Sequence, residues 1–224
     1  MNTLKLIHDL KSLKNFIFIT LKKDKIILLA ALLLGLAVTF QYCKIYSNNT
    51  QNDISENILR FHILAQSNSE NDQLLKMKVK EKILQKLEPK LRNASSKEDL
   101  LRKVTLDLKN IENWGRETLL EEGYDLAVKA ELCKDYFPTK NYADISLPCG
   151  DYDALRITIG DGNGRNWWCV LYPPLCFVDV SKESIDEENR IKLKKCLSED
   201  EYDIISSEPE NINFKFKIIE IFSS

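Results

Sequence analysis

The side chains best suited to catalysis are few in this sequence. Residues 44–224 contain a single histidine, His62, together with five of the six cysteines. A neutral imidazole can accept the proton of a nucleophile, so His62 and Cys169 are the candidate base and nucleophile of a hydrolase. The motifs GxSxG, HExxH and CxxC are all missing from the sequence. The pattern therefore favours His62 as a strand residue on a polar face, and the hydrolase is kept as an alternative.

Sites for metals, phosphates or cofactors are not indicated. One histidine and widely spaced cysteines do not match the ligand spacing of zinc sites. The segment GDGNG, residues 160–164, lacks the Gly-Lys-Ser/Thr ending of a phosphate-binding loop. Its Asp and Gly residues are typical of a hairpin turn between two strands. We expect no catalytic residue, no metal ligand, no cofactor and no small-molecule substrate.

The stretch NWWCVLYPPLCFVD, residues 166–179, gathers unusual side chains in a short space. Pro173 and Pro174 lie between Cys169 and Cys176, and a strand cannot continue there because prolines donate no ladder hydrogen bond. The chain can therefore turn and bring the two sulfurs together in a disulfide, which in a loop this short stabilises by about 2 to 3 kcal/mol. Two reduced, buried cysteines remain the alternative.

Two neighbouring tryptophans in this stretch point to opposite faces of the expected strand. Only one of Trp167 and Trp168 can enter a given core, and the other is either covered by another element or exposed to a partner. We therefore take the stretch as the candidate partner-binding surface. Its candidate residues are Trp167, Trp168, Tyr172, Pro173, Pro174 and Phe177.

Residues 26–43 contain no charged side chain and predict a membrane segment. A helix of this length spans about 27 Å, close to the roughly 30 Å of a hydrocarbon core and longer than the apolar core of most signal peptides. Bulky Phe40 and Tyr42 follow where a cleavage site needs small residues, so we favour an uncleaved anchor over a cleaved signal. Six lysines precede the segment against two aspartates, which places residues 1–25 in the cytoplasm and the rest of the chain outside.

The exported part is acidic. Residues 44–224 contain 26 Lys and Arg against 32 Asp and Glu, a balance that argues against nucleic acid or anionic lipid as the main ligand. Outside the cytoplasm, oxidation of cysteines to disulfides is permitted. We expect an extracytoplasmic domain that is either anchored in the membrane or secreted, and that binds no nucleic acid.

The hydrophobic periodicity of the exported part predicts an α+β domain. Residues 58–67 alternate as a strand, and Ser69 and Ser96 begin two helices whose apolar side chains recur every three to four residues. We predict that both helices pack on one face of a mainly antiparallel sheet. Further strands are expected at residues 124–133, 152–159, 166–172 and 212–222, and a further helix at 181–197.

These patterns divide the chain into five parts. They are a cytoplasmic segment at residues 1–25, a transmembrane anchor or uncleaved signal at 26–43, a polar tether at 44–53, an exported α+β signalling domain at 54–180, and a C-terminal helix and strand extension at 181–224.

Two long blocks and the apolar segment before them carry a resemblance to a known family. The blocks are LRFHILAQSNSENDQLLKMKVKEKIL at Leu59–Leu84 and YFPTKNYADISLPCGDYDALRITIGDGNGRNWWCVLYPPLCFVD at Tyr136–Asp179. Through them the sequence resembles the stage II sporulation protein R family of endospore-forming bacteria. The blocks cover most of residues 59–179, and the string from Trp167 to Asp179 is the most specific part.

The resemblance implies an exported signalling protein that is not an enzyme. Such proteins are made in the forespore and act between the two septal membranes on a membrane-embedded aspartic peptidase of the mother cell, the stage II sporulation GA protein. That peptidase removes the pro-sequence of the sigma-E precursor. The resemblance thus implies this peptidase as the partner, and the N-terminal segment implies contact with the membrane.

Two features depart from the family pattern. Cys133 and Cys149 are not part of its motif, and a second disulfide between them is a further expectation. Residues 181–224 lie outside the two blocks, so their role stays open. A membrane-tethered scaffold at the septum is a third hypothesis, beside the signalling protein and the hydrolase.

Overall fold

The computed structural model describes the backbone of residues 3–177 and 184–206, and the side chains of residues 25–177 and 184–206. The chain divides into two units, residues 1–49 and 50–224. Each unit is described by itself below.

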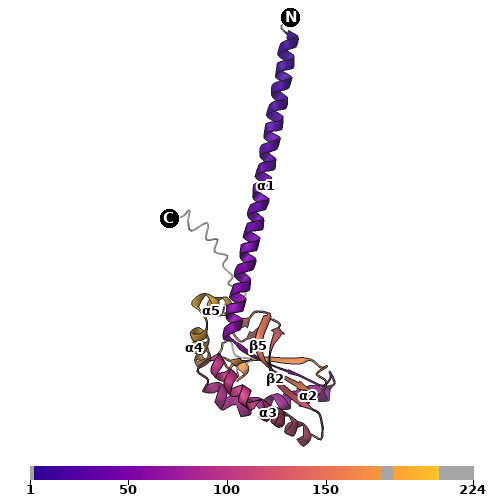
Figure 1. Ribbon diagram of the computed structural model, residues 1–224, viewed down its shortest axis with the longest axis vertical. Coiled ribbons are helices and arrows are strands. Elements are labelled where there is room, and N and C mark those ends of the chain that lie inside the picture. The colour runs from indigo at the N-terminus through magenta and orange to yellow at the C-terminus, as the bar shows by residue number, and fades with distance from the viewer. Residues whose placement is uncertain (1–2, 178–183, 207–224) are drawn as a thin grey trace. The chain divides into compact units, whose positions relative to one another are not determined.

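Helix α1, Thr3–Asn57, contains the predicted membrane segment (Figure 1). Its part Lys25–Asn57 is long and apolar enough to cross a membrane, and its most apolar window has a mean hydropathy of 2.3. A membrane anchor and a signal sequence both fit such a helix near an N-terminus.

The segment predicted as a polar tether, residues 44–53, is helical. It contains neither proline nor glycine, and nearby side chains bond back to the preceding turn. Ser55 Oγ donates to the carbonyl of Asn52 at 2.9 Å, and Asn57 Nδ2 donates to the carbonyl of Asp53 at 2.9 Å. The last turns belong to the second unit, in which Ile54 is fully buried. The segment therefore continues the apolar helix, because it contains no residue that interrupts a helix, and only its end is buried in the second unit.

The strands of the second unit are β1 at Leu59–Leu64, β2 at Val128–Phe137, β3 at Lys140–Tyr142, β4 at Ile145–Leu147, β5 at Gly150–Ile159 and β6 at Asn166–Tyr172. Four of them form a sheet in the order β2-β5-β1-β6, and β3 pairs with β4 in a separate hairpin. In the larger sheet β1 runs parallel to β5, and the other two pairings are antiparallel. The predicted α+β fold with a mainly antiparallel sheet is confirmed.

Two helices, α2 at Glu70–Arg92 and α3 at Lys97–Glu121, pack against the sheet. Each begins after the serine predicted from the sequence: Ser69 Oγ accepts the N–H of Asp72, and Ser96 Oγ accepts the N–H of Asp99. Helix α3 approaches α2 and β2 closely at Gly115, where an added Cβ atom would touch both Val79 of α2 and Val128 of β2. A glycine at this position thus permits the close approach of α3 to α2 and β2.

The chain after β6 forms the short 3-10 turn η1 at Leu175–Phe177 and the helices α4 at Glu187–Cys196 and α5 at Glu199–Ser206. Helix α4 falls within the region where a helix was predicted. The strand predicted at residues 212–222 lies outside the described residues.

The prediction of a hairpin at residues 160–164 is wrong. β5 and β6 are not neighbours, because β1 lies between them. The loop crosses the end of β1 instead: the N–H of Asn163 donates to the carbonyl of Gln66 at 3.2 Å, and the N–H of Gly164 donates to that of Ala65 at 2.8 Å. The positive φ angles expected for a tight turn occur at Gly160 and Gly162, but they serve a crossover rather than a hairpin.

We expect Gly164→Ala to destabilise the domain. A Cβ atom at this position would overlap the backbone carbonyl of Ser67, which cannot rotate away as a side chain could. We expect the free energy of unfolding to fall by about 1 to 3 kcal/mol, as for other overpacked sites. Urea unfolding followed by tryptophan fluorescence measures the change, and the exposed neighbour Asn163→Ala is the control. Equal stabilities for the two variants would contradict the crossover.

Candidate functional site

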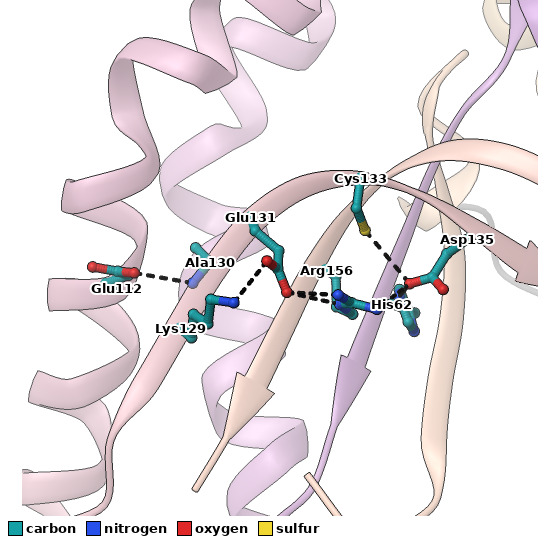
Figure 2. A network of polar contacts seen from close by, with 8 residues as sticks. All are labelled: His62, Glu112, Lys129, Ala130, Glu131, Cys133, Asp135 and Arg156. Atoms are coloured by element: carbon teal, nitrogen blue, oxygen red, sulfur yellow. Dashed lines mark hydrogen bonds and ion pairs between the residues drawn. The ribbon is translucent and has the colours of Figure 1, made fainter. Parts of the chain in front are cut away.

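One row of side chains crosses the sheet on the face that points away from α2 and α3. Glu131 of β2, Arg156 of β5, His62 of β1 and Trp168 of β6 lie directly opposite one another in the strand register. Residues opposite each other on neighbouring strands point to the same face, so these side chains meet. Figure 2 shows the polar members of this row with their partners.

Hydrogen bonds and ion pairs connect the polar part of the row (Figure 2). Arg156 Nε and Nη2 donate to Glu131 Oε1 at 2.9 and 2.7 Å, and Arg156 Nη1 donates to Asp135 Oδ2 at 2.9 Å. The hydrogen bond with Glu131 raises the pKa of Arg156. Lys129 and, after it, Arg156 lower the pKa of the Glu131 carboxyl. The network therefore holds a guanidinium between two carboxyl groups at neutral pH.

His62 is buried at the inner end of this network, with 3% of its surface exposed. Its Nε2 lies 3.0 Å from Asp135 Oδ2, and its ring stacks on that of Trp168 with 4.8 Å between the centroids. Burial lowers the pKa of the imidazole, and this effect outweighs the nearby Asp135 carboxylate, which raises it. His62 is a strand residue as predicted, but it is packed between aromatic rings rather than exposed on a polar face.

The lowered pKa of His62 predicts that acid destabilises the domain. In the unfolded chain the imidazole binds a proton below its ordinary pKa of about 6.5, whereas in the folded protein it stays neutral to lower pH. The unfolded state then binds more protons, so this contribution to stability is present above about pH 6.5 and is lost as the pH falls toward the folded pKa.

We expect the free energy of unfolding of the wild-type chain to drop more between pH 7.5 and pH 5.5 than that of His62→Gln, in urea unfolding at each pH. Other titrating groups, including His8, are common to both proteins and cancel in the comparison. The same pH dependence in both proteins would show that His62 is not buried as a neutral group.

Cys133 lies beside this network and is unsuited to act as a nucleophile. Its Sγ donates to Asp135 Oδ2 at 3.5 Å, and no hydrogen bond joins it to His62 in the part of the chain that the structure describes. Burial raises the pKa of the thiol to about 11. The reactive form of cysteine is the thiolate, so at neutral pH Cys133 is inert. The network joins the strands β1, β2 and β5 through these hydrogen bonds and ion pairs.

The structure separates the two residues of the proposed hydrolase. Cys169 lies opposite Phe61 in the register, whereas His62 lies opposite Trp168. Neighbouring positions of a strand point to opposite faces, so Cys169 and His62 are on different sides of the sheet. In addition, Cys169 forms a disulfide with Cys176, with 5.4 Å between their Cα atoms. No thiolate is available at Cys169 in this state.

The second expected disulfide is not formed, because Cys133 and Cys149 are both free. The register pairs Cys133 with Ala154 and Phe137 with Gly150. Cys149 precedes Gly150, so about five residues of strand, roughly 15 Å, separate the two cysteines along β2. A disulfide requires Cα atoms within about 7 Å.

The predicted partner-binding residues divide into exposed and buried ones. Trp167 faces the helices, edge-on to Phe61 and with Lys80 Nζ 4.9 Å above its ring, and Trp168 faces the opposite side. Both tryptophans are half-buried. Phe177 remains 39% exposed. Tyr172, Pro173 and Pro174 are buried within the domain and offer little surface to a partner.

A buried arginine was missed by the reasoning from sequence. Arg60 is fully buried on the same face of the sheet as His62, and its guanidinium lies 4.6 Å from the centre of the Phe137 ring and 5.0 Å from that of Tyr152. No carboxylate forms an ion pair with it within residues 25–177 and 184–206, and burial lowers its pKa. Cation–π contacts with the rings replace an ion pair. The signal in the sequence is a charged residue inside the apolar run LRFHIL.

Within the described side chains, no group of three or more His, Cys, Asp or Glu residues is placed to hold a metal ion.

Comparison with known proteins finds similarity to one protein family. Residues 55–182 match the family model described as stage II sporulation protein R. The chain is also 36% identical, over 179 residues, to the stage II sporulation protein R of Bacillus subtilis (strain 168), an alignment that covers 78% of this chain and 79% of that protein. No solved structure matches the chain.

Proposed function

Because the chain belongs to the stage II sporulation protein R family, we propose that it is an exported signal that triggers processing of the sigma-E precursor. It is made in the forespore and acts between the two septal membranes. There it binds and activates the membrane-embedded aspartic peptidase of the mother cell, the stage II sporulation GA protein, which cleaves the precursor. The observation that carries the proposal is the family match over residues 55–182.

The proposed activity needs no catalytic residue in this chain. An activator works by binding the active state of its target more tightly than the inactive state, which shifts the population toward activity. Three features support this role: the apolar helix at Lys25–Asn57, the family match across the sheet and both covering helices, and the separation of Cys169 from His62. The helix supplies either the anchor or the export signal that an extracytoplasmic activator requires.

The test is reconstitution in non-sporulating cells. Cells that produce the sigma-E precursor and the peptidase are compared with cells that also produce this chain, and the precursor is followed by immunoblot. We expect the mature size only when this chain is present. A matched variant that lacks residues 1–43 retains the domain but not the apolar segment, and we expect it to be inactive. Unprocessed precursor despite verified export of the full chain would contradict the proposal.

A further inference from the structure

Among the residues that the structure describes, the outer side of β6 is an unpaired edge of the sheet. β6 pairs with β1 on its inner side, and no strand in the described parts of the chain pairs with its outer side. A cavity of about 280 Å³ lies along this edge, between β6 and the strand β3. It is lined by Lys140, Asn141, Tyr142, Asn166, Trp167, Trp168, Cys169, Leu175 and Cys176. An exposed strand edge is a template for pairing with another extended chain.

The opposite edge of the sheet is partly closed. There the Glu112 carboxylate of α3 accepts the backbone N–H of Ala130 in β2 at 3.2 Å. The Glu112 side chain therefore already accepts a backbone N–H that an added strand would need for pairing. Lys129, also on β2, is engaged with Glu131. The two edges thus differ, and the open one carries the two tryptophans.

Cations without acidic partners surround the β6 edge. Lys140 lines the cavity, Arg165 directly precedes β6, and Lys80 lies over the Trp167 ring. Within residues 25–177 and 184–206, none of the three forms an ion pair with a carboxylate. The exported part as a whole carries a net negative charge, so this edge is opposite in charge to the rest of the domain. Complementary charge at the edge favours an acidic ligand.

The edge also carries two large aromatic side chains. Trp167 and Trp168 both line the cavity, and their half-buried rings lie one on each face of β6. An added strand would therefore be flanked by a ring on both sides.

We propose that the outer edge of β6 binds an extended, acidic segment of a partner protein, which adds a strand to the sheet between the two tryptophans. The inference rests on the proposed function, and the segment then belongs to the extracytoplasmic part of the activated peptidase.

Two other possible occupants of the edge fit its positive charge less well. Residues 212–222 of this chain carry two lysines against one glutamate. A second copy paired edge to edge about a two-fold axis would bring the same cations together.

Photocrosslinking in the reconstitution cells tests the site. A benzophenone side chain replaces Asn141, which is exposed beside the cavity, or Leu106, which is 84% exposed on α3 and serves as the control. We expect irradiation to join the full chain to the peptidase from position 141 and not from position 106. Crosslinks from 106 alone, a crosslinked dimer of this chain, or a crosslink only within the chain would each overturn the inference.

Charge reversal tests the chemistry of the ligand. We expect the double variant Lys140→Glu/Arg165→Glu to lower the crosslinking yield at position 141 and the processing of the precursor by about tenfold or more. The double variant Lys86→Glu/Lys109→Glu makes the same change in net charge on exposed positions away from β6, and we expect near wild-type processing. Thiol counting without reductant checks that each variant keeps the Cys169–Cys176 disulfide and hence the fold around β6.

The outcomes separate the two proposals. If the wild-type chain triggers processing and the Lys140→Glu/Arg165→Glu variant does so equally well, the β6 site is wrong and the proposed function stands. If the wild-type chain neither triggers processing nor crosslinks to the peptidase from position 141, both proposals fail. Crosslinking from position 141 without processing supports the site and contradicts the triggering role.

Discussion

Phe137→Ala should be among the most destabilising single substitutions in this domain. The ring is fully buried and is surrounded by three other rings, those of His62, Trp168 and Tyr152, with centroids 5.3, 4.8 and 5.9 Å away. Truncation of a buried phenylalanine leaves a cavity and typically costs 3 to 5 kcal/mol. It would also remove the ring on which the Arg60 guanidinium rests, leaving a buried charge less compensated.

The neighbouring residue supplies the control for this prediction. Tyr136 is 60% exposed, and we expect Tyr136→Ala to change the free energy of unfolding by less than about 0.5 kcal/mol. Both variants are compared with the wild-type chain in urea, with the fluorescence of the three tryptophans as the signal. Domains of this kind are stable by only about 5 to 15 kcal/mol, so the loss at Phe137 is easily resolved. Equal effects at the two positions would show that the aromatic cluster does not hold the sheet together.

Removal of the Cys169–Cys176 disulfide should produce the second large effect. The two residues are seven positions apart, and closing so short a loop contributes about 2 to 3 kcal/mol through the entropy of the unfolded chain. We expect Cys169→Ser, Cys176→Ser and the double variant to lose similar amounts, because each removes the same crosslink. Reduction of the wild-type chain should lower its stability to a comparable level.

Thiol counting tests the same disulfide directly. Under denaturing conditions without reductant, we expect four of the six cysteines to react with an alkylating reagent, and all six after reduction. Cys149→Ser is the matched control, because Cys149 is free and exposed, and we expect it to leave the stability unchanged. Six reactive thiols before reduction would contradict the disulfide.

Local signals in the sequence were enough to locate the helices and several strands. The serine caps at Ser69 and Ser96 begin α2 and α3, and β6 has the bounds expected from its residues. Side-chain alternation also placed Trp167 and Trp168 on opposite faces of β6. These features depend on residues within a few positions of one another, so a short stretch of sequence contains the information.

Two predictions from local sequence patterns were wrong, those for residues 160–164 and 44–53. Residues 160–164 have the composition of a hairpin turn, but β1 enters the sheet between β5 and β6, so the loop must cross its end. Residues 44–53 have the composition of a tether, yet they are helical, and burial of Ile54 holds the end of that helix to the domain. For residues 160–164 the deciding contacts are with Ala65 and Gln66, far away in the sequence.

The sequence by itself determined the α+β class of the domain, the apolar N-terminal helix, the caps of both covering helices and membership of the family through its two blocks. Only the tertiary structure decided the strand order, and with it the row that joins Glu131, Arg156 and His62 and the separation of Cys169 from His62. The physical reason is that periodicity tells which residues of a strand share a face, whereas side chains on different strands meet only through register and adjacency. Those are set by the packing of the whole core.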